Sequence, residues 1–201
     1  MASYIQSTAL IGVAGLNAVY TAGALGYPWV SSTSNPLPSV QVEQMFGQIV
    51  SAQNPDTTVG GGGEFIFLRV PTSTAVTAGL MYTWGDATSG YDIAAIPTSS
   101  GTTTSSGAPV AVAINAVTSN ATSAQGTWFQ VQGRCTVLKD AVKCAPGVPL
   151  YFSKSAAGRV RVIGSAFYGI VGMRSATLTT ITTTTSTALV YLHRPSLTVA
   201  I

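Results

Sequence analysis

The stretch that decides the fold class is Glu64-Phe65-Ile66-Phe67-Leu68-Arg69-Val70. Its aromatic and β-branched residues favour a strand, and the glycines at 60–63 and Pro71 bound it with turn residues. Further short runs of this kind follow, nearly all separated by turn signals, at residues 79–84, 110–117, 127–131, 135–138, 149–152, 159–164, 167–173 and 176–192. Short strands at this spacing predict an all-β protein, a compact antiparallel β-barrel or β-sandwich.

The beginning of the chain differs from the rest because no charged residue occurs before Glu43. We therefore divide the chain into an uncharged N-terminal arm, residues 1–42, and a β-rich domain, residues 43–201. A helix over residues 8–25 is the weaker alternative for part of the arm, because several glycines interrupt it. A surface segment without ions is expected to lie against something, either its own body or a partner.

The arm contains four aromatic residues among small neighbours: Tyr4, Tyr20, Tyr27 and Trp29. Aromatic residues in such surroundings are typical of buried interface cores. Packing inside the same subunit is the alternative. The composition favours a contact with another subunit or with a partner protein.

Charge is scarce and unevenly distributed. The 201 residues include nine Lys or Arg and six Asp or Glu, 7% of the chain, where an average soluble protein carries about 25%. Residues 1–130 contain Arg69 as their single basic residue against five acids, whereas residues 131–201 contain eight basic residues against Asp140 alone. Asymmetry of this kind predicts an electrostatic docking face in the last third of the chain.

The residues chosen for that face are Arg159 and Arg161, with Lys154 nearby. Strand alternation places both guanidinium groups on one side and Val160 and Val162 on the other. This patch would suit an acidic protein surface, although an ordinary solvated strand face is also open. Nucleic acid is not the expected partner, because several phosphates would need neutralising and aromatic residues are few in this region.

Residues suited to catalysis are few. A metal site or a Ser-His-Asp triad would depend on His193, the single histidine, which we interpret as a polar residue at a strand end. The glycines at 60–63 lack the lysine of a phosphate-binding loop, since the first lysine is Lys139. Asp86 and Asp92 have the surroundings of loop acids rather than of a catalytic carboxylate pair. The sequence thus predicts a non-enzymatic protein without a cofactor or a metal.

The two cysteines, Cys135 and Cys144, leave two alternatives open. A two-residue hairpin turn at Lys139 and Asp140 would place them opposite each other, at a distance that permits a cross-strand disulfide. Lys-Asp is a poor sequence for such a turn, however, and a longer turn would leave two half-buried free thiols.

A membrane is not an expected partner. The longest apolar stretch, residues 8–29, includes polar residues and several glycines and has no flanking Lys or Arg. Residues 1–7 also lack the positive charge of a secretory signal. We expect a soluble protein.

Several stretches resemble the head decoration, or cement, proteins of tailed bacteriophages. They are Glu64 to Val70 running into Val76-Thr77-Ala78-Gly79, then Gly126-Thr127-Trp128-Phe129-Gln130-Val131-Gln132-Gly133, then Cys144-Ala145-Pro146-Gly147-Val148-Pro149-Leu150-Tyr151. The Gly-x-Trp-x-Gln-Val-x-Gly pattern is the most specific. The resemblance covers residues 47–201. Residues 1–42 have no recognised counterpart, and the uncharged arm and the threonines at 182–185 depart from the family's pattern.

The resemblance implies a structural virion protein on the outer surface of a phage head. Such proteins commonly form trimers at junctions between capsomers and clamp major capsid proteins together. We therefore expect a homotrimer whose partner is the major capsid protein. The alternative function is a carbohydrate- or host-binding β-module of a phage fibre or spike, which Trp84 or Trp128 exposed in a groove would favour. A hydrolase on a β-scaffold, dependent on His193, is a third and weaker alternative.

Overall fold

The structure is a computed structural model that is described here for part of the chain. The described residues are 5–6, 20–21, 30–31, 46–54, 61–85, 90–96, 107–122, 124–153, 155–162, 168–184 and 186–199. Every regular element in these ranges is a strand, so the predicted all-β class is confirmed. None of the described residues belongs to a helix of the length and apolarity that a membrane span requires.

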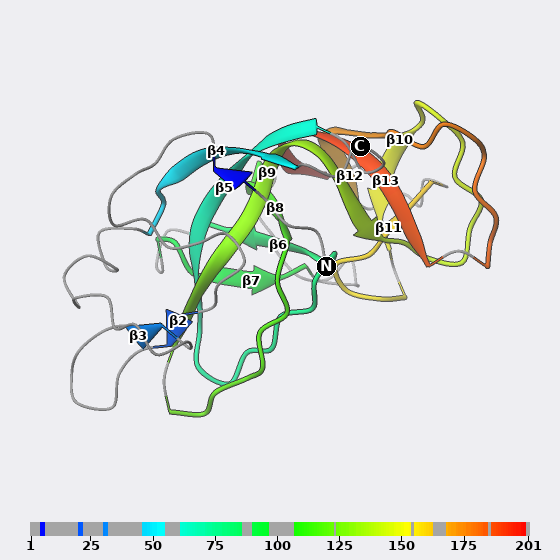
Figure 1. Cartoon of the computed structure of the whole chain (residues 1–201). Helices are drawn as coiled ribbons and strands as arrows, with labels where there is room; N and C mark the ends of the chain where they lie inside the picture. Colours follow the sequence, from blue (N-terminus) through cyan, green and yellow to red (C-terminus); the bar gives the residue numbers. More distant parts are fainter. Residues whose placement is uncertain are drawn as a thin grey trace.

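The thirteen strands of the described ranges form one curled antiparallel sheet, shaped as half a barrel (Figure 1). The hydrogen-bonded path through it is β1-β4-β5-β9-β13-β12-β10-β11, and β2, β3, β6, β7 and β8 attach beside this path. The strands are β1 (Ile5–Gln6), β2 (Tyr20–Thr21), β3 (Val30–Ser31), β4 (Ile49–Asn54), β5 (Gly61–Val70), β6 (Met81–Trp84), β7 (Ile93–Ala95), β8 (Val110–Ala113), β9 (Gln125–Leu138), β10 (Pro149–Phe152), β11 (Val160–Arg161), β12 (Tyr168–Ser175) and β13 (Thr187–Val199).

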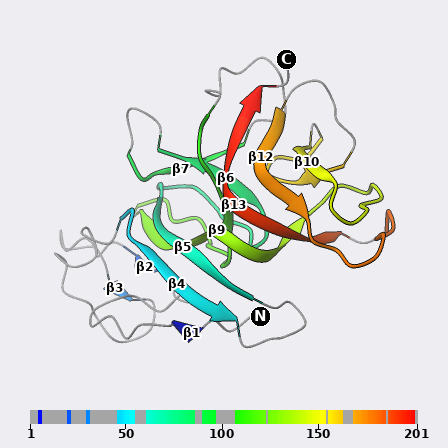
Figure 2. The ribbon, with the colours of Figure 1, turned by 90° about the horizontal axis from the view of Figure 1, so that it is seen from above.

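Strand β9 is the central strand of the sheet, paired on both of its edges. One of its edges pairs with β5 (Figure 2). Its other edge pairs with β2, β8 and β13, in that order along the strand. The prediction of two separate strands, at 127–131 and 135–138, is wrong, because Gly133 does not end the strand. It adopts a φ of 99°, beside a shift of register between β5 and β9, and the ladder continues beyond it. Both halves of the sheet are therefore built on one 14-residue strand.

The sheet bends where β12 and β13 run together. Gly172 has a φ of 79° and Arg194 a φ of 44°, and the pairing shifts register between Val171 and Met173. A Cβ on Gly172 would collide with the carbonyl oxygen of His193, so only glycine permits this close approach. The bend lets the C-terminal part of β13 leave β9 and face residues 107–109.

Buried side chains form separate layers on the two faces of the sheet. The larger cluster fills the curl between β6, β8, β10, β12, β13 and the second half of β9, and a second cluster lies between β5, β6, β8 and the first half of β9. The opposite face of β5 and β9 contains Phe65, Phe67 and Trp128, all 0% exposed. Phe46 stacks on Phe67 there, with ring centroids 5.5 Å apart.

Several predicted boundaries need correction. The strand predicted at 149–152 is confirmed as β10, but the one predicted at 176–192 is wrong over most of its length, since β13 begins at Thr187 and extends to Val199. The glycines at 61–63, predicted as turn residues that bound the strand, are not a turn. They belong to β5, and a Cβ on Gly63 would collide with the carbonyl oxygen of Gln132 on β9.

Of the two alternatives for Lys139 and Asp140, the two-residue hairpin turn is not formed. The Lys139 ammonium donates hydrogen bonds to the carbonyls of Asp140, Val142 and Thr182 at 3.1, 2.8 and 3.1 Å, so the chain wraps around this side chain. Cys135 consequently pairs with Val190, and Cys144 pairs with Ile181. Of the two alternatives, free thiols are confirmed, and both are buried.

Three short strands of the N-terminal arm are described. Strand β1 pairs with β4, β2 pairs with the beginning of β9, and β3 pairs with β2. These pairings join the arm to the sheet of its own chain at two places. The boundary predicted between residues 42 and 43 lies outside the described residues.

Candidate functional site

The residues predicted to bind a partner are only partly described. Tyr4, Tyr27, Trp29 and Lys154 lie outside the described residues. Tyr20 lies in β2, with its backbone paired to Gly126.

Arg159 and Arg161 are half-buried at one edge of the sheet. The Arg159 guanidinium donates to the Lys139 carbonyl at 3.3 Å, so it helps to hold the loop around that lysine. Arg161 lies in β11 opposite Tyr151, and Val160 beside it is 1% exposed. At least one of the two arginines therefore has a structural contact.

A different group of residues forms a basic surface on the outer face of the sheet. Arg134 on β9 lies directly opposite Tyr191 on β13, and Tyr191 lies directly opposite Arg174 on β12. Directly opposed residues share a face, so these three make a continuous row across three strands, which we call the arginine–tyrosine row. Tyr191 is 56% exposed, Arg174 is exposed and Arg134 is half-buried.

Alternation along the strands explains why the row faces outwards. Cys135, Val190, Leu192 and Met173, the neighbours of the row along their strands, are all buried in the larger cluster. Side chains one position away therefore point to the opposite face.

Neither arginine of the row has an ion pair among the described residues. In those ranges, Glu64 pairs with Arg194 at 2.9 Å and Asp92 pairs with Arg69 at 3.5 Å. The row thus presents two uncompensated positive charges with an exposed tyrosine between them. Sequence reasoning missed it because residues 134, 174 and 191 become neighbours only through strand register.

One basic residue of the last third is internal. Lys139 is 1% exposed, and burial lowers the pKa of its ammonium while the neighbouring Asp140 carboxylate partly offsets that effect. Its ammonium is held by backbone carbonyls and cannot act as a surface charge. Burial also raises the pKa of the Cys135 thiol, which keeps this thiol in its unreactive protonated form.

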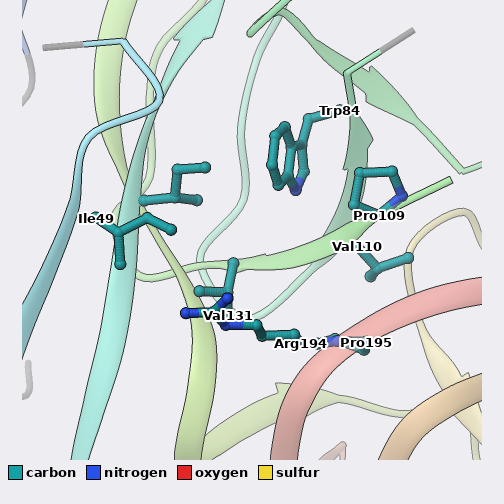
Figure 3. Close-up of a pocket in the computed structure, with 8 residues that line it drawn as sticks. Ile49, Trp84, Pro109, Val110, Val131, Arg194 and Pro195 are labelled. Atoms are coloured by element: carbon teal, nitrogen blue, oxygen red, sulfur yellow. The ribbon is translucent and has the colours of Figure 1, made fainter.

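The two tryptophans proposed as markers of a binding groove differ. Trp128 is 0% exposed and packs on Phe67 at 5.1 Å, so it is a core residue. Trp84 is half-buried and lines a pocket of about 200 Å³ (Figure 3). The lining residues are Ile49, Ile66, Trp84, Pro109, Val110, Val131, Arg194 and Pro195. Figure 3 shows Trp84 facing Val131 and Arg194 across this space, with Ile49 on one side and Pro109 on the other.

The residues considered for catalysis are scattered. His193 is exposed on β13 opposite Gln132, Asp92 pairs with Arg69, and Asp86 lies outside the described residues. Within the described part of the chain, no group of three His, Cys, Asp or Glu residues is placed to hold a metal ion.

The fold and these surfaces define, for the described part of the chain, an all-β protein with an exposed basic row and a small apolar pocket. No protein family, no curated protein and no solved structure matches the chain.

Proposed function

We propose that the protein is a capsid decoration protein, which binds the outer surface of a phage head as a homotrimer and strengthens contacts between major capsid proteins. The observation that carries this proposal is the arginine–tyrosine row on the outer face of the sheet. The resemblance of residues 47–201 to head decoration proteins supports the same function.

The composition of the row suits a protein interface. Tyrosine and arginine are the residues most enriched, with tryptophan, among those that dominate binding energy. A stable interface of about 1,600 Å² needs only a few such residues at its centre, and three copies in a trimer would multiply the attachment. The uncompensated charges of Arg134 and Arg174 favour an acidic surface on the capsid protein.

Substitutions in the row test this proposal. We expect Tyr191→Ala to weaken binding to empty heads of the source phage by about 30-fold or more, as truncation of an interface hot spot does. Arg174→Gln should weaken it several-fold and reduce its dependence on salt, because the lost contact is electrostatic. Co-sedimentation with heads that lack the protein measures both effects.

The matched control for charge is Lys143→Gln, which removes one positive charge from an exposed position outside the row. It should bind as the unchanged protein does. Equal losses for Arg174→Gln and Lys143→Gln would show that net charge, and not the row, attaches the protein.

The N-terminal arm gives a separate test. We expect deletion of residues 1–30 to abolish trimer formation and to weaken head binding. The measured mass should fall from three times 20.5 kDa to that of a single truncated chain. The reason is that the arm contributes apolar and aromatic contact area between subunits or to the capsid. Light scattering and co-sedimentation measure the two effects, and an unchanged oligomer with unchanged head binding would exclude this role for the arm.

A second candidate function is the carbohydrate- or host-binding module. The observation that favours it is the position of Trp84 in a pocket, which is the feature expected of such a module.

A further inference from the structure

The Trp84 pocket has properties that the proposed capsid attachment does not use. We propose that it binds one apolar side chain of an acidic protein segment, with a leucine-sized group inside and a neighbouring carboxylate at Arg194. This inference is independent of the capsid proposal, because it depends only on the groups that line and border the pocket.

The size of the pocket selects a single side chain. Its volume of about 200 Å³ lies below the ~300–1,000 Å³ that is typical of small-molecule sites. Its walls are mainly apolar, formed by aliphatic side chains, two prolines and the Trp84 ring. An aliphatic side chain would fill it and remove these walls from water.

The polar groups at the pocket are hydrogen-bond donors. The Trp84 indole Nε1 is buried and has no acceptor among the described residues. Buried donors normally have a partner, and leaving one without any is unfavourable. A backbone carbonyl of a bound segment would supply the missing acceptor.

Arg194 contributes a positive charge to the same pocket. Its Nε and Nη2 both donate to Glu64 Oε2, at 3.2 and 2.9 Å, which fixes the plane of the guanidinium. The Arg194 side chain is nevertheless 63% exposed, and Nη1 takes no part in this pair. A carboxylate on the bound segment can therefore approach the guanidinium from the solvent side.

Two partly exposed residues lie at the border of the pocket. Ile49, which lines it, and Tyr91, which stacks on Trp84 with ring centroids 6.3 Å apart, are each 45% exposed. Such a border shields a central contact from water when a protein segment lies across it. A sugar is less suited, because its many hydroxyl groups require acceptors as well as donors and the walls provide few polar atoms.

The test is an NMR titration of the full chain with the blocked dipeptide N-acetyl-Leu-Asp-amide. The signal is the Trp84 indole N–H resonance, which is identified by its loss in Trp84→Phe. We expect a saturable shift of this resonance at millimolar peptide. N-acetyl-Ala-Asp-amide should bind about tenfold more weakly, since it cannot fill the apolar space.

The carboxylate contact is tested by two changes that should agree. N-acetyl-Leu-Asn-amide on the unchanged protein, and N-acetyl-Leu-Asp-amide on Arg194→Gln, should each bind about 2- to 10-fold more weakly. Lys143→Gln is the matched control, because it removes an exposed charge outside the pocket. It should leave the affinity unchanged.

Three results would overturn the proposal. They are the absence of any saturable shift up to about 20 mM N-acetyl-Leu-Asp-amide, equal affinity for the Leu and Ala peptides, and tighter binding of N-acetylglucosamine than of either peptide. The last result would assign the pocket to a carbohydrate instead. No capsid is present in the titration, so a negative titration does not contradict the capsid proposal. A negative co-sedimentation result likewise does not contradict the pocket proposal.

Discussion

Gly133→Ala is expected to lower the free energy of unfolding by about 3 kcal/mol or more, enough to unfold much of a protein of ordinary stability. Gly133 has a φ of 99°, which side chains other than glycine rarely adopt. An added Cβ would also collide with the carbonyl oxygen of Gly62 on β5. The obstacle is backbone held in place by β4, so it cannot move aside as a flexible side chain would.

Gly147→Ala separates the two causes. Gly147 has a similarly positive φ of 71°, but nothing lies within 4 Å of the position that its Cβ would take. This control should lose only about 1 kcal/mol, the cost of backbone strain. Urea unfolding followed by tryptophan fluorescence measures both variants. If Gly133→Ala loses no more than Gly147→Ala, the close approach of β5 and β9 is not essential to the fold.

The presence of strands could be predicted from sequence because its signals are local. The run from Glu64 to Val70 lies inside β5, and the range 149–152 coincides with β10. Period-two burial, β-branched residues and bounding turns act over a few positions, so a single stretch suffices to recognise them.

The continuity of β9 through Gly133 could not be predicted from local signals. Gly133 has the composition of a turn, yet β5 and β13 pair with it on both sides and keep it in the ladder. The Gln130 side chain supports this arrangement, since its Nε2 donates to the carbonyls of Gln132 and Arg134 at 3.0 and 3.3 Å. Whether a glycine ends a strand or forms a bulge depends on its neighbours in space.

The residues that carry the resemblance to decoration proteins have packing roles. In the Gly-x-Trp-x-Gln-Val-x-Gly pattern, a Cβ on Gly126 would lie 2.6 Å from the Phe67 ring, and Trp128 is buried against the same ring. The pattern therefore describes how β5 and β9 fit together. The proposed capsid contact therefore depends on the exposed face, where the arginine–tyrosine row lies.

The sequence could predict which part of the chain carries the candidate site, but not which residues form it. The excess of basic residues after position 130 indicated a docking face, but the residues chosen for it, Arg159 and Arg161, lie at an edge. The row depends on the pairing of β9, β12 and β13, and the register between β12 and β13 shifts at Gly172. Such registers are long-range properties that a local pattern does not contain.

Lys139→Met is expected to lower the free energy of unfolding by about 3–5 kcal/mol, and the melting temperature by roughly 6–15 °C. Methionine nearly preserves the volume of the side chain, so the change removes the ammonium and leaves the packing. The carbonyl of Asp140 also accepts from the Val142 N–H, but those of Val142 and Thr182 would lose the Lys139 donor. Removing the buried charge relieves its desolvation, yet these two carbonyls lose a charged hydrogen-bond donor.

Lys143→Met provides the comparison, since Lys143 lies in the same loop but is exposed. It should change the free energy of unfolding by less than about 0.5 kcal/mol, as most surface substitutions do. Thermal unfolding of the three proteins at one pH measures the difference. Equal melting temperatures for Lys139→Met and Lys143→Met would mean that the loop does not need its internal ammonium. A loss confined to Lys139→Met would instead show that the internal ammonium stabilises the loop between β9 and Cys144.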